Sequence, residues 1–207
     1  MPIIKKGLNE PNIQFAIWEI TESENELFDA LDSSIKDDEP LAEIKVESRR
    51  LESLAARCAL QELLKPYGDF EIYKDQFGKP HLRDESIGLS ISHAKGFAAA
   101  AINLEGDIGI DIEHERDQVV KIAHKFIHST EREWVAQDIH RLTQVWSAKE
   151  ALYKLHGRTK LAFAEQLITK NLDREFGEGK IIEKKEGVSL YKLYQPNETP
   201  LVTVIAY

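Results

Sequence analysis

GIDIE, residues 109–113, is the stretch that decides the fold. Its isoleucines alternate with glycine, aspartate and glutamate, which is the period of a strand with one apolar and one acidic face. Asp111 and Glu113 therefore point to the same side. Two like charges placed side by side are unfavourable unless water or a cation lies between them. The pattern thus predicts that a cation or a basic side chain lies beside Asp111 and Glu113.

WSAKEALYK, residues 146–154, is the second informative stretch, and its pattern indicates a helix. Glu150 and Lys154 lie one turn apart, a spacing at which side chains are neighbours on a helix. If this helix packs across the strand, Glu150 and Lys154 converge with the two strand acids. Alternatively, the acids are edge-strand charges and Glu150 and Lys154 form an ordinary surface pair. Composition alone does not separate these interpretations.

The overall composition indicates a globular protein. The chain has 207 residues, of which 42% are hydrophobic and 30% charged, so it can bury a core as one large or two small domains. No apolar run approaches the roughly 20 residues that cross a bilayer, which predicts no membrane segment. The net charge of -9 argues against general nucleic-acid binding. The single cysteine, Cys58, cannot form an internal disulfide and favours a reducing cytoplasm.

The order of elements predicts two similar halves. In the first half we expect a strand at residues 13–20, a short helix at 21–31, an acidic break at 37–40, a long helix at 40–65 and strands at 70–73, 88–92 and 97–103. In the second half we expect a strand at 107–113, a helix from 129 or 130 to 140 with a Thr130–Glu133 capping box, a helix at 142–155 and strands at 180–183, 188–194 and 201–207.

This order predicts an α+β fold. We expect an N-terminal α+β subdomain at residues 1–105 and a similar C-terminal one at residues 106–207. The two would be related by a pseudo-twofold axis, with the active site in the cleft between them.

Basic side chains in the first half are candidates for binding an anion. FGKP, residues 77–80, is a glycine-proline turn that projects Lys79, and His93 lies in a loop that joins two strands. Arg50 and Arg57 share one side of the long helix. Their planar guanidinium groups could bind a phosphate, although most such arginines are surface residues whose stems cover apolar neighbours.

Three carboxylates without a sulfur or imidazole set suit Mg²⁺ better than zinc. Magnesium is typically held by one or two carboxylates together with water and substrate phosphates. Lysines 79, 149 and 154 then become partners for phosphate charge. A hydrolase that uses two carboxylates is a further option, but nothing in the sequence indicates an apolar pocket with aromatic platforms for a sugar.

The motifs FGKP (77–80), SH (92–93), GIDIE (109–113) and WSAKEALYK (146–154), in this order and spacing, resemble those of the 4′-phosphopantetheinyl transferases. The resemblance spans roughly residues 48 to 160. The length resembles the surfactin-synthetase-activating type, a monomeric pseudo-dimer. The shorter holo-acyl-carrier-protein synthases begin almost directly at the strand motif and form trimers, whereas residues 1–108 precede it here.

The resemblance implies Mg²⁺-dependent transfer of 4′-phosphopantetheine from coenzyme A to a serine of an apo acyl or peptidyl carrier protein, with release of adenosine 3′,5′-bisphosphate. By motif match, Asp111, Glu113 and Glu150 would hold Mg²⁺ against the pyrophosphate. Glu150 could also act as general base, and Lys154 would neutralise charge on the phosphate under attack. The alternative is a non-catalytic relative that binds coenzyme A or a carrier protein.

The resemblance also assigns roles to residues outside the two central motifs. Lys79 and His93 would bind the phosphates or ribose of the nucleotide, and Arg50 or Arg57 would bind its 3′-phosphate. Glu131 is a weaker candidate metal ligand. Because carrier proteins are usually acidic, we expect a local basic face, formed by Arg132, Arg141, Lys149 and Lys160.

Overall fold

The structure is a computed structural model that describes residues 3–10, 12–32, 44–68, 70–83, 87–157, 160–183 and 187–207. The chain divides into two compact units, Met1–Ile108 and Gly109–Tyr207. The acidic break expected at residues 37–40 and the expected start of the long helix at residue 40 lie outside the described residues. Among the described helices, none combines the length and the apolar character that spanning a membrane requires.

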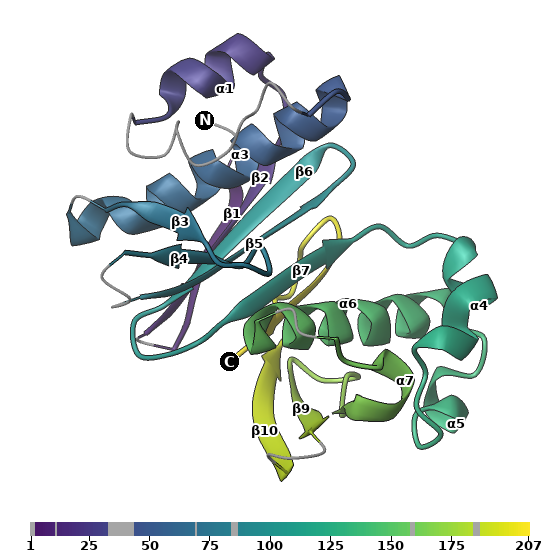
Figure 1. The fold of residues 1–207 in the computed structure, drawn as a ribbon. Helices are drawn as coiled ribbons and strands as arrows, with labels where there is room; N and C mark the ends of the chain where they lie inside the picture. The colour runs from purple at the N-terminus through teal and green to yellow at the C-terminus, as the bar shows by residue number, and fades with distance from the viewer. Residues whose placement is uncertain are drawn as a thin grey trace. The chain divides into compact units, whose positions relative to one another are not determined.

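The first unit is built on a four-stranded antiparallel sheet (Figure 1). Its strand order is β1 (Ile3–Glu10), β2 (Ile13–Glu19), β6 (Phe97–Asn103) and β5 (Gly88–Ala94). Strand β6 lies inside the sheet, and its Ala98 and Ala100 belong to the core under the long helix. Their small side chains leave room for a helix to pack closely. Strand β1 was not predicted, because lysines interrupt its apolar residues.

Helix α3 (Glu47–Leu64) packs on this sheet, against β6, β2 and β5. Helix α1 (Glu24–Ala30) packs in turn on α3, and it starts with a capping box between Ser23 and Glu26. Cys58 is buried in the same core, and burial raises the pKa of its thiol to about 12. The cysteine is therefore a packing residue of this core.

A small hairpin of β3 (Ile72–Lys74) and β4 (Pro80–Leu82) follows α3 and the short 3₁₀ helix η2 (Lys65–Tyr67). Its turn is held by Asp75, whose Oδ1 accepts hydrogen bonds from the backbone N–H groups of Phe77 (2.8 Å) and Lys79 (2.9 Å). The turn needs a left-handed residue, and Gly78 supplies it with φ +81°. This geometry fixes the backbone from which the Lys79 side chain extends.

The second unit is a five-stranded antiparallel sheet with one long helix on it (Figure 1). Its strand order is β7 (Gly109–Glu113), β11 (Val202–Ala206), β10 (Gly187–Tyr194), β9 (Phe176–Glu183) and β8 (Leu167–Lys170). Helix α6 (Ile139–His156) packs mainly on β7 and β11. The shorter helices are α4 (Gln118–Ile122), η3 (Ala123–Lys125), α5 (Arg132–Val135) and α7 (Phe163–Gln166).

Each unit is thus an antiparallel sheet with a helix of 18 residues packed on it. This architecture confirms the predicted α+β class. The pseudo-twofold relation between the two subdomains stays a prediction.

The prediction of one helix from residue 129 or 130 to 140 is wrong. Helix α5 covers only Arg132–Val135, and Ala136 then adopts φ +45°, which a continuing helix does not allow. The predicted Thr130–Glu133 capping box is also wrong, because the Thr130 hydroxyl lies 2.8 Å from Nδ1 of His128 and α5 begins without a side-chain cap. Helix α6 begins at Ile139, and Asp138 caps it, because its carboxylate accepts a hydrogen bond from the backbone N–H of Arg141 at 2.8 Å.

Gly109 permits the close approach of α6 to β7, and its replacement provides a test. A Cβ atom at this position would lie 1.9 Å from the carbonyl oxygen of Ala151 on α6. We expect Gly109→Ala to lower the free energy of unfolding by about 1–3 kcal/mol, because backbone rather than a flexible side chain must move. Urea-induced unfolding followed by circular dichroism measures this change.

Gly106→Ala is the matched control. A Cβ at Gly106 finds its nearest neighbour, Nδ2 of Asn103, at an ordinary 3.6 Å. The control should unfold within about 0.5 kcal/mol of the wild type. Equal stability of the two variants would show that α6 does not need glycine at position 109.

Candidate active site

The two acids of β7 alternate with Ile110 and Ile112, which are fully buried, so both acids point to the other side of the strand. Asp111 is buried and Glu113 is half-buried. Burial raises the pKa of Glu113, and the neighbouring charge of Asp111 raises it further. The surroundings therefore disfavour the ionised form of Glu113, and positive charge beside it would favour that form.

Helix α6 presents polar side chains to these acids. The Lys154 ammonium donates to Oδ1 of Asp111 at 2.8 Å. The indole N–H of Trp146 donates to Oε1 of Glu113 at 3.2 Å, and the hydroxyl of Ser147 donates to the backbone carbonyl of Asp111 at 3.2 Å. The structure thus confirms that the helix packs across the strand and brings Lys154 to Asp111.

Glu150 occupies the part of α6 between these contacts. It lies four residues after Trp146 and four before Lys154, so the three side chains share one side of the helix. Because both neighbours reach β7, Glu150 lies above the same strand, and its side chain is half-buried. Its roles as metal ligand and general base stay predictions.

The donor set of β7 fits Mg²⁺. Within the described part of the chain, no three or more His, Cys, Asp or Glu side chains are already gathered as a metal site. Two carboxylates are nevertheless a usual protein contribution to bound Mg²⁺, which water and substrate phosphates complete. The raised pKa of Glu113 supports this fit, since a divalent cation would offset both burial and the repulsion from Asp111.

Lys79 lies in the first unit, where its ammonium is 2.8 Å from Oδ1 of Asp107. The Lys79 side chain is only 7% exposed, whereas that of Asp107 is 66% exposed. The buried ammonium is thus held by an exposed acid, and the role of Lys79 in binding the phosphates or ribose stays a prediction.

His93 of β5 lies against the start of α3. Its Nε2 is 3.0 Å from Nη1 of Arg49 and 3.5 Å from Oε2 of Glu52, and Arg49 also pairs with Glu52 at 3.0 Å. Sequence reasoning missed Arg49, which directly precedes the predicted Arg50. The available signal was its spacing of three residues from Glu52, but only the fold places it beside His93.

The two arginines predicted from the sequence contact different partners. Arg50 donates through Nε to the carboxylate of Glu24 at 2.9 Å, which ties α3 to α1. Arg57 is 3% exposed and donates through Nη1 to the carbonyl and hydroxyl oxygens of Ser53. Arg57 is thus buried along α3, and its role in binding the 3′-phosphate stays a prediction.

Glu131 and Lys149 form a buried ion pair of 2.8 Å. The other bonds of Glu131 come from the backbone N–H of His128 and from the N–H and hydroxyl of Thr169. Both carboxylate oxygens of Glu131 are thus engaged within the second unit. Its role as a weaker metal ligand stays a prediction. Lys149 is fully buried, and burial lowers its pKa against the opposing charge of Glu131. Its prediction as part of a basic surface is wrong.

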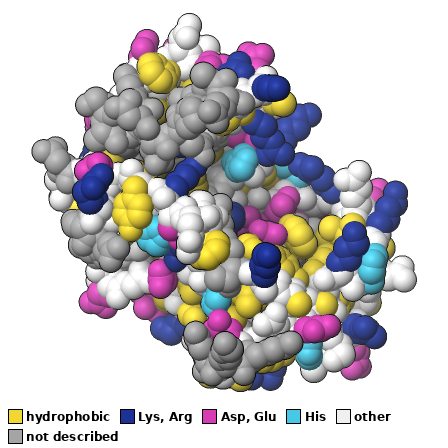
Figure 2. Space-filling view, viewed as in Figure 1, with side chains coloured by type: hydrophobic (Ala, Val, Ile, Leu, Met, Phe, Trp, Pro, Cys, Tyr) yellow, Lys and Arg dark blue, Asp and Glu magenta, His cyan; other side chains and the backbone are white. Residues whose placement is uncertain are grey.

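An apolar groove lies beside Glu113. Its volume is about 450 Å³, and its lining residues, which define the apolar groove, are Glu113, His114, Arg116, Gln118, Val119, Lys121, Ile122, Thr143 and Trp146. Figure 2 shows hydrophobic side chains gathered over this region of α4 and α6, with acidic and basic side chains around them. A carboxylate of the candidate site thus borders a surface with apolar and basic groups.

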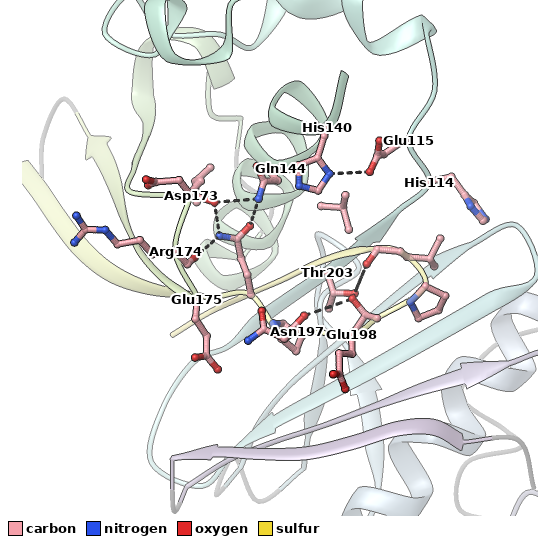
Figure 3. A pocket seen from close by; sticks show the side chains of 17 residues that line it. His114, Glu115, His140, Gln144, Asp173, Arg174, Glu175, Asn197, Glu198 and Thr203 are labelled. Atoms are coloured by element: carbon pink, nitrogen blue, oxygen red, sulfur yellow. Dashed lines mark hydrogen bonds and ion pairs between the residues drawn. The ribbon is translucent and has the colours of Figure 1, made fainter. Parts of the chain in front are cut away.

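A second, more polar cavity of about 540 Å³ lies at the start of α6 (Figure 3). The Gln144 side chain donates to Gln195 and to the backbone carbonyl of Leu172, which joins α6 to two loops. At the other side, His140 pairs with Glu115 at 2.7 Å. None of the residues predicted for catalysis, metal binding or nucleotide binding lines this cavity.

Comparisons with known proteins place the chain among phosphopantetheinyl transferases. Residues 107–195 match the model of the 4′-phosphopantetheinyl transferase superfamily, and residues 37–103 match that of the 4′-phosphopantetheinyl transferase N-terminal domain. The 4′-phosphopantetheinyl transferase gsp of Aneurinibacillus migulanus is 31% identical over 112 residues, which cover 52% of this chain and 46% of that protein. The holo-[acyl-carrier-protein] synthase of Bacillus pumilus is 39% identical over 75 residues, which cover 28% of this chain and 62% of that protein.

The chain belongs to the 4′-phosphopantetheinyl transferase superfamily. The N-terminal domain match accords with the predicted longer type, in which a full subdomain precedes the strand motif. The chain spans about half to three-fifths of the length of the curated relatives it matches, 46% and 62%.

The raised pKa of Glu113 predicts that this acid destabilises the metal-free protein. Folding favours the protonated carboxyl, so the cost is absent below the usual pKa of 4.5 and fully present above the raised folded value. We expect Glu113→Gln to unfold at a higher temperature than the wild type at pH 7 in chelator, with the difference shrinking as the pH falls. Differential scanning calorimetry between pH 4 and 8 measures this.

Glu133→Gln is the control, because Glu133 is exposed on α5. It should follow the wild type at every pH. A lower melting temperature of Glu113→Gln at pH 7 would show that the indole bond stabilises the carboxylate more than burial destabilises it.

Proposed function

We propose that the protein catalyses Mg²⁺-dependent transfer of 4′-phosphopantetheine from coenzyme A to a serine of an apo carrier protein, releasing adenosine 3′,5′-bisphosphate. The observation that carries the proposal is the contact of α6 with β7, where Lys154 reaches Asp111 and Trp146 reaches Glu113. Membership of the superfamily supports it.

In the proposed reaction, the serine oxygen bonds to the phosphorus that carries pantetheine, and the bond from that phosphorus to the oxygen of adenosine 3′,5′-bisphosphate breaks. Asp111 and Glu113 would hold Mg²⁺, which supplies positive charge to the pyrophosphate. Glu150 takes the serine proton, directly or through water. Lys154 lies 2.8 Å from Asp111 and stabilises negative charge that develops on the phosphate.

The nucleotide part of coenzyme A is assigned to residues of the first unit. Lys79 and His93 are proposed to bind its phosphates or ribose. Arg49 lies beside His93 and has a side chain that is 60% exposed, so it is better suited to the 3′-phosphate than Arg50 or Arg57. That these residues and the acids of β7 act on one coenzyme A molecule stays a prediction.

The acceptor is proposed to bind at the apolar groove. Its apolar residues Val119 and Ile122 lie close to Glu113, and Arg116 and Lys121 add positive charge. An acidic carrier protein has the complementary charge, and the groove would bring its serine next to the β7 acids. Of the basic face expected at Arg132, Arg141, Lys149 and Lys160, burial excludes only Lys149, and the other three residues are exposed. The apolar groove is proposed as an additional surface for the carrier.

The reaction is tested by incubating the protein with Mg²⁺, coenzyme A and a panel of apo-carriers, followed by mass spectrometry of the carriers. The proposal requires a phosphopantetheine adduct on at least one carrier. We expect Asp111→Ala and Glu150→Ala to remain folded by circular dichroism while the rate falls at least about 10²-fold, because each loses a group near the reacting phosphate.

Wild-type rates in either variant would show that the metal and base are misplaced. Binding of coenzyme A without an adduct on any carrier would favour the non-catalytic alternative. Asp173→Ala serves as control, since it changes an acid of the polar cavity and not of the candidate site.

The carrier surface is tested by charge reversal. We expect Arg116→Glu combined with Lys121→Glu to raise the KM for an acidic apo-carrier about tenfold at low salt, with kcat and the KM for coenzyme A little changed. The effect should shrink in 0.5 M NaCl, because salt screens exposed charges. Lys170→Glu, an exposed change on β8, is the control. An unchanged carrier KM at low salt would remove the groove from the proposal.

A further inference from the structure

The buried Lys149 makes three hydrogen bonds that the proposed chemistry does not use. Its ammonium donates to the carbonyl of Phe126 at 2.6 Å, to Oε2 of Glu131 at 2.8 Å and to the carbonyl of Phe163 at 3.1 Å. These acceptors come from the segment after η3, the segment before α5 and the start of α7. One ammonium therefore fixes three parts of the second unit against α6.

The two residues whose carbonyls Lys149 binds also contact the indole of Trp146 with their rings. The rings of Phe126 and Trp146 meet edge to face with centroids 5.1 Å apart, and those of Trp146 and Phe163 are 5.7 Å apart. Phe163 further contacts Tyr153 at 5.4 Å. Aromatic pairs in such arrangements have preferred geometries, so the orientation of the indole depends on where the two phenylalanines stand.

The indole of Trp146 connects these aromatic contacts to the candidate site. Its N–H donates to Oε1 of Glu113 at 3.2 Å. Contacts thus run without interruption from the Lys149 ammonium, through the backbones and rings of Phe126 and Phe163, to the indole of Trp146 and the carboxylate of Glu113. All of these residues belong to the second unit.

We infer that Lys149 is a positioning residue, which orients the Glu113 carboxylate through Trp146 and its two phenylalanine neighbours. The inference rests on the proposed function where it concerns transfer, but its geometric part concerns the metal-free protein alone. Glu131 contributes to this positioning. Its carboxylate accepts a hydrogen bond from the Lys149 ammonium and is itself fixed by hydrogen bonds from the backbone N–H groups of Thr169 and His128.

The energetics of the buried Lys149–Glu131 ion pair support a role in orienting neighbouring groups. Burying an ammonium and a carboxylate costs desolvation free energy that their attraction only partly offsets, so such pairs contribute little net stability. Three directional bonds from one ammonium do constrain the backbones they reach. Groups that orient a metal-binding side chain from behind typically change metal affinity or activity about 10–100-fold when they are removed.

The experiment is a double-mutant cycle of Lys149→Met and Phe163→Leu in full-length protein labelled with ¹⁵N-tryptophan. The chain has three tryptophans, and Trp18, which belongs to the core of the first unit, gives the internal reference signal. In metal-free buffer we expect both single variants to shift the indole N–H signal of Trp146 and leave that of Trp18 in place. The double variant should shift it no further than the larger single effect, because both changes interrupt one series of contacts.

Phe163→Leu keeps the inference testable if Lys149→Met does not fold, because Phe163 is half-buried and its backbone carbonyl remains for Lys149. Lys149→Gln then replaces Lys149→Met in the cycle. Phe163→Tyr keeps the ring and should restore the Trp146 signal. Gln144→Met is the matched control on α6, since it removes bonds to Leu172 and Gln195 without touching the phenylalanines.

In the transfer assay we expect Lys149→Met and Phe163→Leu to raise the Mg²⁺ concentration for half-maximal rate about tenfold, and Gln144→Met to leave it unchanged. An unmoved Trp146 signal in the Lys149 variant, or an equal shift in Gln144→Met, would overturn the inference. Absence of transfer in the wild type would refute the proposed function alone, because the indole signal is measured without metal or substrate.

Discussion

The close approach of α6 to β7 is the constraint on which the second unit depends. Position 109 needs glycine, because a Cβ there would overlap the backbone carbonyl oxygen of Ala151 on α6. The approach brings the Lys154 ammonium to Asp111 and the Trp146 indole to Glu113, so one packing contact both closes the core and assembles the candidate site. Gly109, Asp111 and Glu113 alternate with the isoleucines, so the glycine and the two acids face α6 from the same side of β7.

The two lysines of α6 illustrate how position on a helix decides the role of a charge. Lys149 and Lys154 are five residues apart and therefore point to different sides. Lys149 turns into the core and satisfies its charge with Glu131 and two backbone carbonyls. Lys154 turns toward β7 and meets Asp111 at the edge of the site. The first charge is thus buried within the second unit, whereas the second faces the candidate site.

The sequence indicated much of the second unit because its signals are local. The alternation of apolar and acidic residues predicted β7 and the shared face of Asp111 and Glu113. Helical spacing predicted that Glu150 and Lys154 lie on one side of a helix. The arginines of α3 were assigned less well, since helical spacing shows which side chains are neighbours but not what each faces. Arg57 is buried, Arg50 pairs with Glu24 of another helix, and Arg49 meets His93 of a distant strand.

The sequence by itself determined the acidic strand, the helix that packs on it, the family to which the chain belongs and most strands of both units. Those features depend on periodicity and on residue types within one element. Only the tertiary structure decided that Glu131 and Lys149 neutralise each other in the core, that Arg49 meets His93, and that an apolar groove borders Glu113. Burial and the pairing of charges depend on which distant elements pack together, and no local pattern encodes that.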